Sequence, residues 1–300
     1  MLLVTGGAGF IGAQLVAAAL AAGHTVRVLD DLSTGDKRAV PDTAELIEGD
    51  VSDPDAVAHA LDGVSAVAHL AAHRAVPRSL VDPLATDRAN TAGTLTVLEQ
   101  ARRAGTVERV VIASSSSVYG SAAALPTPED TPPQPRSPYA VSKLAAEHYA
   151  RVYAELHGLS TLSLRLFNVY GPGQPAAGPY AQLVPRALHD DILTIDGDGT
   201  HSRDLVYVAD VAEAFLRALA ASTHGVLNVG TGQAATVNEV VALAAKARGR
   251  PLDVVHGPAR PADVPHTCAD VSRAGHQLGW RARVGLEEGL ALTAQAASAR

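Results

Sequence analysis

The chain contains a single cysteine, Cys268, in 300 residues. A disulfide within the chain is therefore excluded, which favours a reducing compartment, the cytoplasm. The chain also lacks any block of lysines and arginines, and its formal net charge is -7. It therefore carries no basic footprint for nucleic acid.

Long apolar runs are missing as well. The longest, Ala13 to Ala22, is too short to cross a bilayer and lacks the flanking features of a signal peptide. The twelve histidines are scattered, and no pair has convincing metal-ligand spacing. We therefore expect no membrane, nucleic-acid or metal partner. A hydrophobic content of 47% is ample for one large or two small globular domains.

The N-terminal stretch predicts a strand, a tight turn and a helix. A short apolar run precedes the turn Gly6-x-x-Gly9-x-x-Gly12, an alanine-rich segment follows it, and a second apolar run ends at Asp30. Glycines let the backbone approach a pyrophosphate, and a carboxylate after the second strand accepts hydrogen bonds from ribose hydroxyls. The pattern predicts a dinucleotide site. Because Asp30 would repel a 2′-phosphate, it favours NAD over NADP.

Strand-like and helix-like segments then alternate, which predicts an α/β fold with a Rossmann-type, doubly wound parallel sheet. The strand candidates are residues 46–47, 66–70, 109–113 and 161–166, and the helix candidates between them are 54–61 and 87–104. Residues 1–170 are expected to form the NAD-binding domain. Residues 171–300 are expected to form mainly a smaller α/β substrate-binding region, with residues 203–232 rejoining the first domain.

Ligands of such sheets bind beyond the carboxyl ends of the strands. Asp50 follows the third strand, where it could meet the adenine side of a cofactor or cap the next helix. His69 ends the fourth strand and is more typical of a packed core histidine than of a ligand. Four serines, Ser114 to Ser117, follow the fifth strand. These strand ends are the candidate site.

A helix is predicted to start at Ser137, with proline as its first residue. Tyr139 and Lys143 are four positions apart and therefore share one face of it. A nearby ammonium is expected to lower the phenol pKa towards the working pH, and a hydroxyl from Ser114 to Ser117 could share the proton. Together with the dinucleotide site, this pair indicates an oxidoreduction centre.

The motifs together resemble the extended short-chain dehydrogenase/reductase superfamily, and within it the NAD-dependent nucleotide-sugar epimerases of the UDP-glucose 4-epimerase type. The resemblance spans nearly the whole chain. The motifs that carry it are TGGAGFIG (5–12), VLDDLSTG (28–35), HLAA (69–72), SSSSVYG (114–120), YAVSK (139–143), LFNVYGP (166–172), GDGTHSRDLVYVADVA (197–212), NVGTG (228–232) and LGW (278–280).

The resemblance implies roles for individual residues. Ser115, Tyr139 and Lys143 match the catalytic positions, with Tyr139 as the general base and acid. The positions that match cofactor contacts are Gly6, Gly9, Phe10, Ile11, Gly12, Asp30, Asp31, Ser33, Thr34, Gly35, Asp50, Val51, Leu70, Ala71, Ala72, Arg74, Asn90, Tyr139 and Lys143. Those that match nucleotide-sugar contacts are Ser115, Ser116, Tyr139, Asn168, Val184, Arg203, Arg260, Asp263 and Thr267. Arg203 and Arg260 suit a diphosphate because guanidinium binds phosphate oxygens well.

The implied reaction is inversion at C4 of a nucleotide-diphosphate sugar through a transient 4-keto intermediate. Ser116 and Ser117 stand where related dehydratases carry an Asp-Glu pair, which disfavours dehydration. Reduction and non-catalytic NAD binding are less favoured alternatives. A dTDP-sugar or another nucleotide carrier stays open, because Asp196 stands where the family often has an aromatic residue near the base. The sequence also leaves open whether a uronic acid is accepted.

Two further implications concern the sugar and the assembly. Thr267 falls where a bulky tyrosine in some members restricts the sugar pocket, so a threonine suggests that N-acetylhexosamines fit alongside hexoses. Such enzymes commonly form homodimers through two helices per subunit, which here correspond to residues 87–104 and 138–157.

Overall fold

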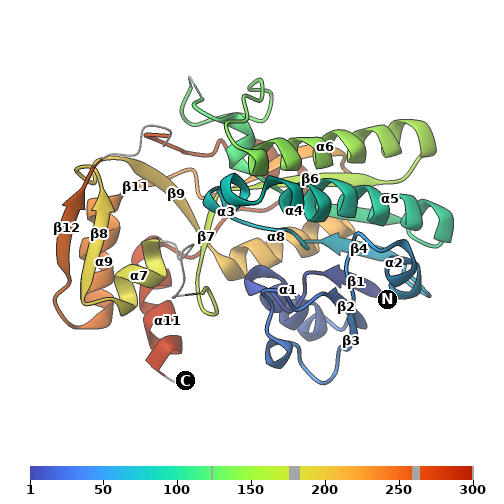
Figure 1. Ribbon diagram of the computed structural model, residues 1–300, viewed down its shortest axis with the longest axis horizontal. Coiled ribbons are helices and arrows are strands. Elements are labelled where there is room, and N and C mark those ends of the chain that lie inside the picture. The colour runs from blue at the N-terminus through green and yellow to red at the C-terminus, as the bar shows by residue number, and fades with distance from the viewer. Residues whose placement is uncertain (123, 176–182, 259–263, 299–300) are drawn as a thin grey trace.

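The computed structural model describes residues 1–122, 124–175, 183–258 and 264–298 (Figure 1). Its main sheet has seven parallel strands in the order β10-β6-β5-β4-β1-β2-β3. The strands are β1 (Leu2–Thr5), β2 (Val26–Asp30), β3 (Glu45–Glu48), β4 (Ala66–His69), β5 (Arg109–Ser115), β6 (Thr161–Leu166) and β10 (Gly225–Val229). The order reverses between β1 and β4, as in doubly wound folds. The predicted fold class is confirmed.

Alternating side chains of the strands pack on helices of opposite faces, because successive residues of a strand point to opposite sides. On one face, Leu2 and Val4 pack in a core with α1 (Phe10–Ala21) and α8 (Val208–Ala220). On the other face, Leu3 packs in a core with α2 (Pro54–Ala60) and α5 (Gly93–Ala104). Figure 1 shows α5 and α6 (Pro138–His157) on one side of the sheet and α1 and α8 on the other.

The segment predicted as one helix over 87–104 is more complex. It comprises the end of α4 (Pro83–Asp87), a π-helical turn at Arg88–Ala92, and α5; α3 (Val76–Val81) precedes it. Asn90 lies in the wide turn, where its amide holds both backbone groups of His73 (2.8 and 3.2 Å) and donates to Ser142 Oγ at 3.0 Å. The turn therefore ties the loop after β4 to α6.

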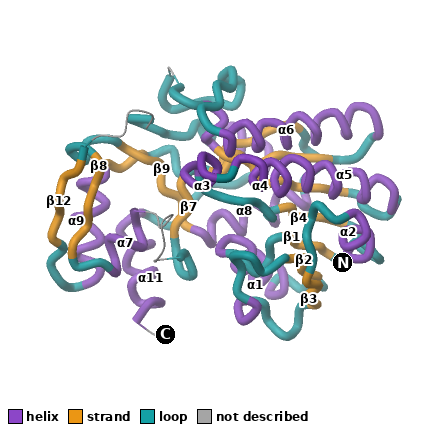
Figure 2. The backbone as a smooth tube through the Cα atoms, viewed as in Figure 1, coloured by secondary structure: helices purple, strands orange, loops and turns teal. Residues whose placement is uncertain are grey.

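Two smaller sheets form the remaining part of the molecule, on the left of Figure 2. Their strands are β7 (Asn168–Tyr170), β8 (Ile192–Asp196), β9 (Ser202–Tyr207), β11 (Ala234–Thr236) and β12 (Asp253–Gly257), and the helices that pack with them are α7 (Leu183–His189), α9 (Val237–Arg248) and α11 (Leu286–Ser298). Helix α10 (Ser272–Leu278) packs instead in the core that α1 and α8 form with the main sheet. Of the stretch 203–232, β10 and α8 belong to the main sheet and its covering layer, whereas β9 pairs with β7 and β11.

Candidate active site

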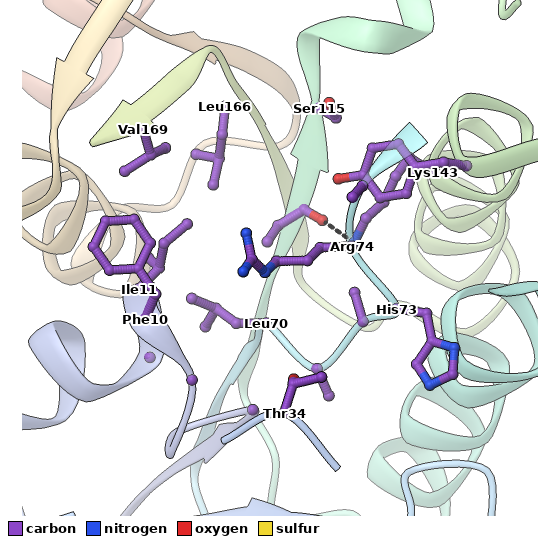
Figure 3. Close-up of a pocket in the computed structure, with 18 of the residues that line it drawn as sticks. Phe10, Ile11, Thr34, Leu70, His73, Arg74, Ser115, Lys143, Leu166 and Val169 are labelled. Carbon is purple, nitrogen blue, oxygen red and sulfur yellow. Dashed lines mark hydrogen bonds between the residues drawn. The ribbon is translucent and has the colours of Figure 1, made fainter. Parts of the chain in front are cut away.

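A cavity of about 440 Å³ opens beyond the carboxyl ends of the main-sheet strands (Figure 3). The predicted cofactor positions that line it are Gly6, Gly9, Phe10, Ile11, Gly12, Asp30, Asp31, Ser33, Thr34, Asp50, Val51, Leu70, Ala71, Ala72, Arg74, Tyr139 and Lys143. The predicted substrate positions that line it, besides Tyr139, are Ser115, Ser116, Asn168, Arg203 and Thr267. Motifs from distant parts of the chain thus meet in one place.

The glycine turn after β1 has no space for side chains. Gly6 has φ +70°, and a Cβ there would lie 2.7 Å from Ala71 N. A Cβ on Gly12 would lie 2.0 Å from Gly6 O. Beyond the turn, α1 begins at Phe10 with Gly9 as N-cap and no capping side chain. The amides of this first turn have no partner within the helix, so they suit the phosphates of a dinucleotide.

Asp30 is buried at the end of β2 and lines the same cavity. Its carboxylate accepts hydrogen bonds from Ala8 N and Leu32 N, both at 2.9 Å. Burial raises the pKa of Asp30, and the two amides oppose that shift. Each oxygen keeps a lone pair for a ribose hydroxyl. The cradle of amides and this carboxylate therefore fit a dinucleotide without a 2′-phosphate.

Three predicted contact residues do not line the cavity. Gly35 packs under it, where a Cβ would lie 2.8 Å from Ala8 Cβ and 2.9 Å from Asp30 Oδ1. Asn90 is buried behind it and fixes the backbone of His73. Val184 is 2% exposed and belongs to the apolar core of the smaller part of the molecule. Gly35 and Asn90 therefore support the walls of the cavity, whereas Val184 lies in the core of the smaller part of the molecule.

Two further predictions, Arg260 and Asp263, lie outside the described residues. Both alternatives for Asp50 can be compared with the structure: it lines the cavity and accepts from Ser52 N at 2.8 Å, while Asp53 caps α2. His69 is a core residue, as predicted, held by Thr5 and Thr94 hydroxyls at 2.7 and 3.0 Å. Burial lowers the pKa of His69 to about 3.

Tyr139 and Lys143 come from the first two turns of α6. Ser137 caps this helix by accepting from Ala140 N at 3.1 Å, a contact that contributes about 1 kcal/mol. Lys143 Nζ donates to Ala113 O at 2.9 Å and lies 5.9 Å from the centroid of the Tyr139 ring. The Ser115 hydroxyl, at the end of β5, is near enough to the Tyr139 phenol to lower its pKa. One helix and one strand end thus bring the three side chains together.

The expected lowering of the phenol pKa by Lys143 is wrong for the chain as it stands. Burial raises the pKa of Tyr139, and the groups that oppose this are Ser115 and the charge of Arg74. Burial also lowers the pKa of Lys143 to about 8, against the attraction of Glu147. Lys143 is directed at the carbonyl of Ala113, and Figure 3 shows Arg74 extending into the middle of the cavity.

The charges that line the cavity are segregated. The carboxylates, Asp30, Asp31 and Asp50, follow β2 and β3. The cations Arg74 and Lys143 line the part near Ser115, and Arg203 reaches it from β9. Among the described residues, none of the lining carboxylates follows β5, where Tyr139 and Ser115 meet. The arrangement suits a sugar diphosphate next to the phenol.

Two lining residues, His73 and Gln174, were missed from the sequence. His73 directly follows the HLAA motif, and its Nδ1 is buried without a hydrogen bond. Its position shortly after a strand was the available signal. Gln174 lies in a stretch rich in glycine and proline, residues 171–179, which carries no such signal. Ser117, one of the four predicted serines, donates to Ser115 Oγ at 2.9 Å through its hydroxyl.

Neither a metal cluster nor a bilayer-spanning helix is found within the described part of the chain. No group of three or more His, Cys, Asp or Glu side chains is arranged to hold a metal ion there. None of the described helices is long and apolar enough to cross a membrane.

Comparison with known proteins gives a consistent result. A model of the NAD dependent epimerase/dehydratase family matches residues 2–230. The chain is 39% identical to a UDP-glucose 4-epimerase of Mycolicibacterium smegmatis, over 98% of this chain and 97% of that protein.

Solved structures cover the whole fold. A UDP-glucose 4-epimerase of Thermus thermophilus, in complex with NAD, superposes with a TM-score of 0.92 at 37% identity, over 98% of both chains. A UDP-N-acetylglucosamine 4-epimerase of Methanobrevibacter ruminantium, in complex with UDP-N-acetylmuramic acid, gives a TM-score of 0.95 at 31% identity, over 99% of this chain and 98% of that one.

Proposed function

The chain belongs to the NAD dependent epimerase/dehydratase family, and on that premise we propose that it inverts C4 of a nucleotide-diphosphate sugar, with UDP-glucose and UDP-galactose as first candidates. The observation that carries the proposal is the meeting of Ser115, Tyr139 and Lys143 beside a glycine cradle in one cavity. We assign residues 1–170 with part of 203–232 to NAD binding and most of 171–300 to the substrate. A cytoplasmic location agrees with the single cysteine.

The chain's residues would hold NAD as follows. The first-turn amides of α1 bind the pyrophosphate, Asp30 accepts from the adenosine ribose, and Lys143 holds the nicotinamide ribose. Bound NAD would supply a reversible acceptor for the hydride of the sugar carbon, so the reaction would involve no net oxidation.

The proton of the 4-hydroxyl is handled by Tyr139. Once it has lost its own proton, its phenolate oxygen would accept the 4-hydroxyl proton as the carbonyl forms and would give it back afterwards. The Ser115 hydroxyl favours the phenolate and, by our assignment, would bond the same sugar oxygen. The charge of Arg74 favours the phenolate, which burial alone disfavours. Ser117 in turn donates to Ser115 Oγ and so orients it.

The diphosphate is assigned to Asn168 and Arg203, with Arg260 and Asp263 proposed from the sequence alone. Asn168 begins β7 and Arg203 lies on β9, two strands that pair directly. The guanidinium of Arg203 donates to Ser202 O at 2.9 Å, which fixes its position at the mouth of the cavity. A fixed arginine fork suits phosphate oxygens.

Dehydration is the alternative that the cavity disfavours most. Elimination of water needs an additional acid and base near the reacting carbon. In the described part of the lining, the side chains beside Ser115 are Ser116 and Ser117, and the carboxylates lie at the far end. A hydroxyl cannot replace a carboxylate as a base at neutral pH. Epimerisation needs only the groups that are present.

Turnover on UDP-galactose, UDP-N-acetylgalactosamine and a dTDP-hexose tests the proposed function. Product is followed by chromatography of the 4-epimer. We expect conversion of UDP-galactose and slower or no conversion of the dTDP-sugar. Protein that binds NAD yet converts none of these substrates would instead be a non-catalytic NAD-binding protein.

Thr267 gives a prediction about the sugar. Its hydroxyl is buried beside the cavity and has no hydrogen-bond partner among the described residues, while its amide is fixed by Ser202 O at 3.1 Å. A larger side chain here would fill space that an N-acetyl group needs. We expect Thr267→Tyr to lower kcat/KM for UDP-N-acetylgalactosamine relative to UDP-galactose by about tenfold or more. A tenfold loss corresponds to a lost contact or a steric clash of ~1.4 kcal/mol. Thr267→Ser is the matched control, and equal losses on both sugars would contradict the assignment.

We also propose a homodimer formed through α5, α6 and the helices α3 and α4, which precede α5 in the chain. Leu80, Val81 and Leu84 on α3 and α4 are 65%, 78% and 82% exposed, and Val141 on α6 is 53% exposed. The helices that carry them lie side by side in Figure 1. An exposed group of large apolar side chains is typical of a protein interface.

Leu84→Glu tests this interface. A carboxylate buried in an apolar contact is unfavourable, so we expect the variant to elute as a monomer at micromolar concentration in size-exclusion chromatography with light scattering. Ile192→Glu is the control, because Ile192 is a 59% exposed apolar residue on β8, away from these helices. A wild-type protein that is already monomeric would contradict the proposal.

A further inference from the structure

Glu147 lies one helical turn after Lys143 on α6 and is almost fully buried. Arg165 of β6 binds its carboxylate with two nitrogens, Nε at 2.9 Å and Nη2 at 2.7 Å. The side chains of this pair are only 4% and 5% exposed. Burying a carboxylate this deeply costs desolvation free energy even when it is paired, so stability alone does not explain its position next to Lys143.

The ion pair is itself fixed from the other side. Arg165 donates its remaining nitrogen to Glu129 O at 3.0 Å, and its guanidinium lies 4.6 Å from the centroid of the Tyr119 ring. Tyr119 in turn donates to Asn228 Oδ1 at 2.6 Å. The carboxylate of Glu147 therefore has one position, set by several strands and loops.

Lys143 and Glu147 hold neighbouring residues at the end of β5. Lys143 Nζ donates to Ala113 O at 2.9 Å, and Ser114 Oγ donates to Glu147 Oε1 at 2.5 Å. The next residue is Ser115, whose hydroxyl lowers the pKa of the Tyr139 phenol. The two side chains of α6 thus fix the backbone that aims Ser115 into the cavity.

Glu147 is also the negative charge that faces the ammonium of Lys143. The other titratable groups around Lys143 in the described structure are His69 of β4, which has a pKa of about 3 and is neutral, and Tyr139, whose pKa burial raises and which is neutral until it acts as the base. Arg74 and Arg165 are positive. Burial lowers the pKa of Lys143, and only Glu147 opposes it.

We propose that Glu147 is a positioning residue for the epimerase reaction, which holds Lys143 in its charged form and fixes the strand end that presents Ser115. The inference rests on the proposed function, because it assigns Glu147 a role through the lysine and serine of that site. It assigns Arg165 the task of holding the Glu147 carboxylate in place. The carboxylate would not touch substrate or cofactor.

The consequence is a pH dependence with a definite sign. A lysine whose pKa is about 8 loses its charge as the pH rises through 8, so activity should decline on that alkaline side. Glu147→Gln removes the charge that raises this pKa, so the decline should move to lower pH. Arg165 is unchanged in the variant, so the shift equals the interaction between Glu147 and Lys143, which a Coulomb estimate at an effective dielectric of about 20 puts at about one pH unit or more.

The test combines two readouts on Glu147→Gln. The first is the pH profile of kcat with UDP-galactose. The second is the rate at which cyanate carbamoylates Lys143, followed by peptide mass spectrometry across pH, since only the uncharged amine reacts. We expect both alkaline midpoints to fall by about one unit, with several-fold faster carbamoylation at pH 7. Glu155→Gln, the same charge change at an exposed site on α6, should move neither.

A structural role alone would lower the melting temperature and leave both midpoints unchanged, and that result in a folded variant would overturn the proposal. If Glu147→Gln does not fold because Arg165 is left unpaired, Glu147→Gln/Arg165→Met removes both charges. A lower alkaline midpoint is expected for this double variant too, because Glu147 is the charge that raises the pKa of Lys143. Wild-type protein without turnover would refute the proposed function, whereas the carbamoylation midpoints would still decide the role of Glu147.

Discussion

Tyr139→Phe is expected to lower kcat by about a thousandfold or more, because a positioned general base and acid contributes roughly 10² to 10⁴ and here one group serves both steps. The substitution removes one oxygen from a side chain that already lies in the cavity, so the fold and the cofactor site should be kept. The measurement is turnover of UDP-galactose together with the NAD content of the purified protein.

Tyr149→Phe is the matched control, since Tyr149 lies on the same helix and packs against the core that α2 and α5 form with the sheet. It should keep nearly full turnover. A Tyr139→Phe protein with a near-normal rate would end the assignment of the phenol as base. A protein without NAD would show that the phenol is needed for cofactor retention instead.

Gly12→Ala is expected to abolish NAD binding, the second large effect. A Cβ at Gly12 would lie 2.0 Å from Gly6 O and 2.7 Å from Gly7 Cα, distances at which backbone atoms must move. The atoms that would move form the cradle for the pyrophosphate, so bound NAD should fall at least tenfold, with turnover falling in parallel. Calorimetric titration of NAD into the purified variant measures this.

The control is Gly285→Ala, because a Cβ on Gly285 would meet nothing within 4 Å. It should bind NAD as the wild type does. If Gly12→Ala lowers stability as well, circular dichroism separates the two effects, since a folded fraction that binds NAD normally would contradict the steric argument.

The strands and helices of the main sheet could be predicted because their local sequence and their burial agree. The apolar runs ending at Asp30 and Leu166, and the serine-proline start of α6, are where the structure has them. The prediction of one continuous helix over 87–104 was wrong in detail, because the local sequence does not indicate the π-helical turn from which Asn90 holds His73. The stretch 203–232 was expected to rejoin the first domain, but its strand β9 pairs with β7 and β11. The sequence of one strand does not show which other strands it pairs with.

The residues of the candidate site could largely be predicted from the sequence, but their charge states and the contacts of their charged groups could not. The spacing of Tyr139 and Lys143 shows that they share a helix face, but it does not show that Lys143 turns to Ala113 O. Burial of the phenol, which raises its pKa, depends on side chains from several distant segments. For the same reason Glu147 attracted no notice: its role depends on Arg165, which is 18 residues away in sequence.

In the proposed reaction, hydrogen leaves C4 of the sugar as hydride and returns to that carbon without exchanging with water. The direct measurement is conversion of UDP-galactose in D₂O, with the product examined by proton NMR. We expect UDP-glucose that keeps its full proton signal at C4 and at its neighbouring carbons. Deuterium at C4 or C5 would indicate proton abstraction from carbon and would contradict hydride transfer at C4.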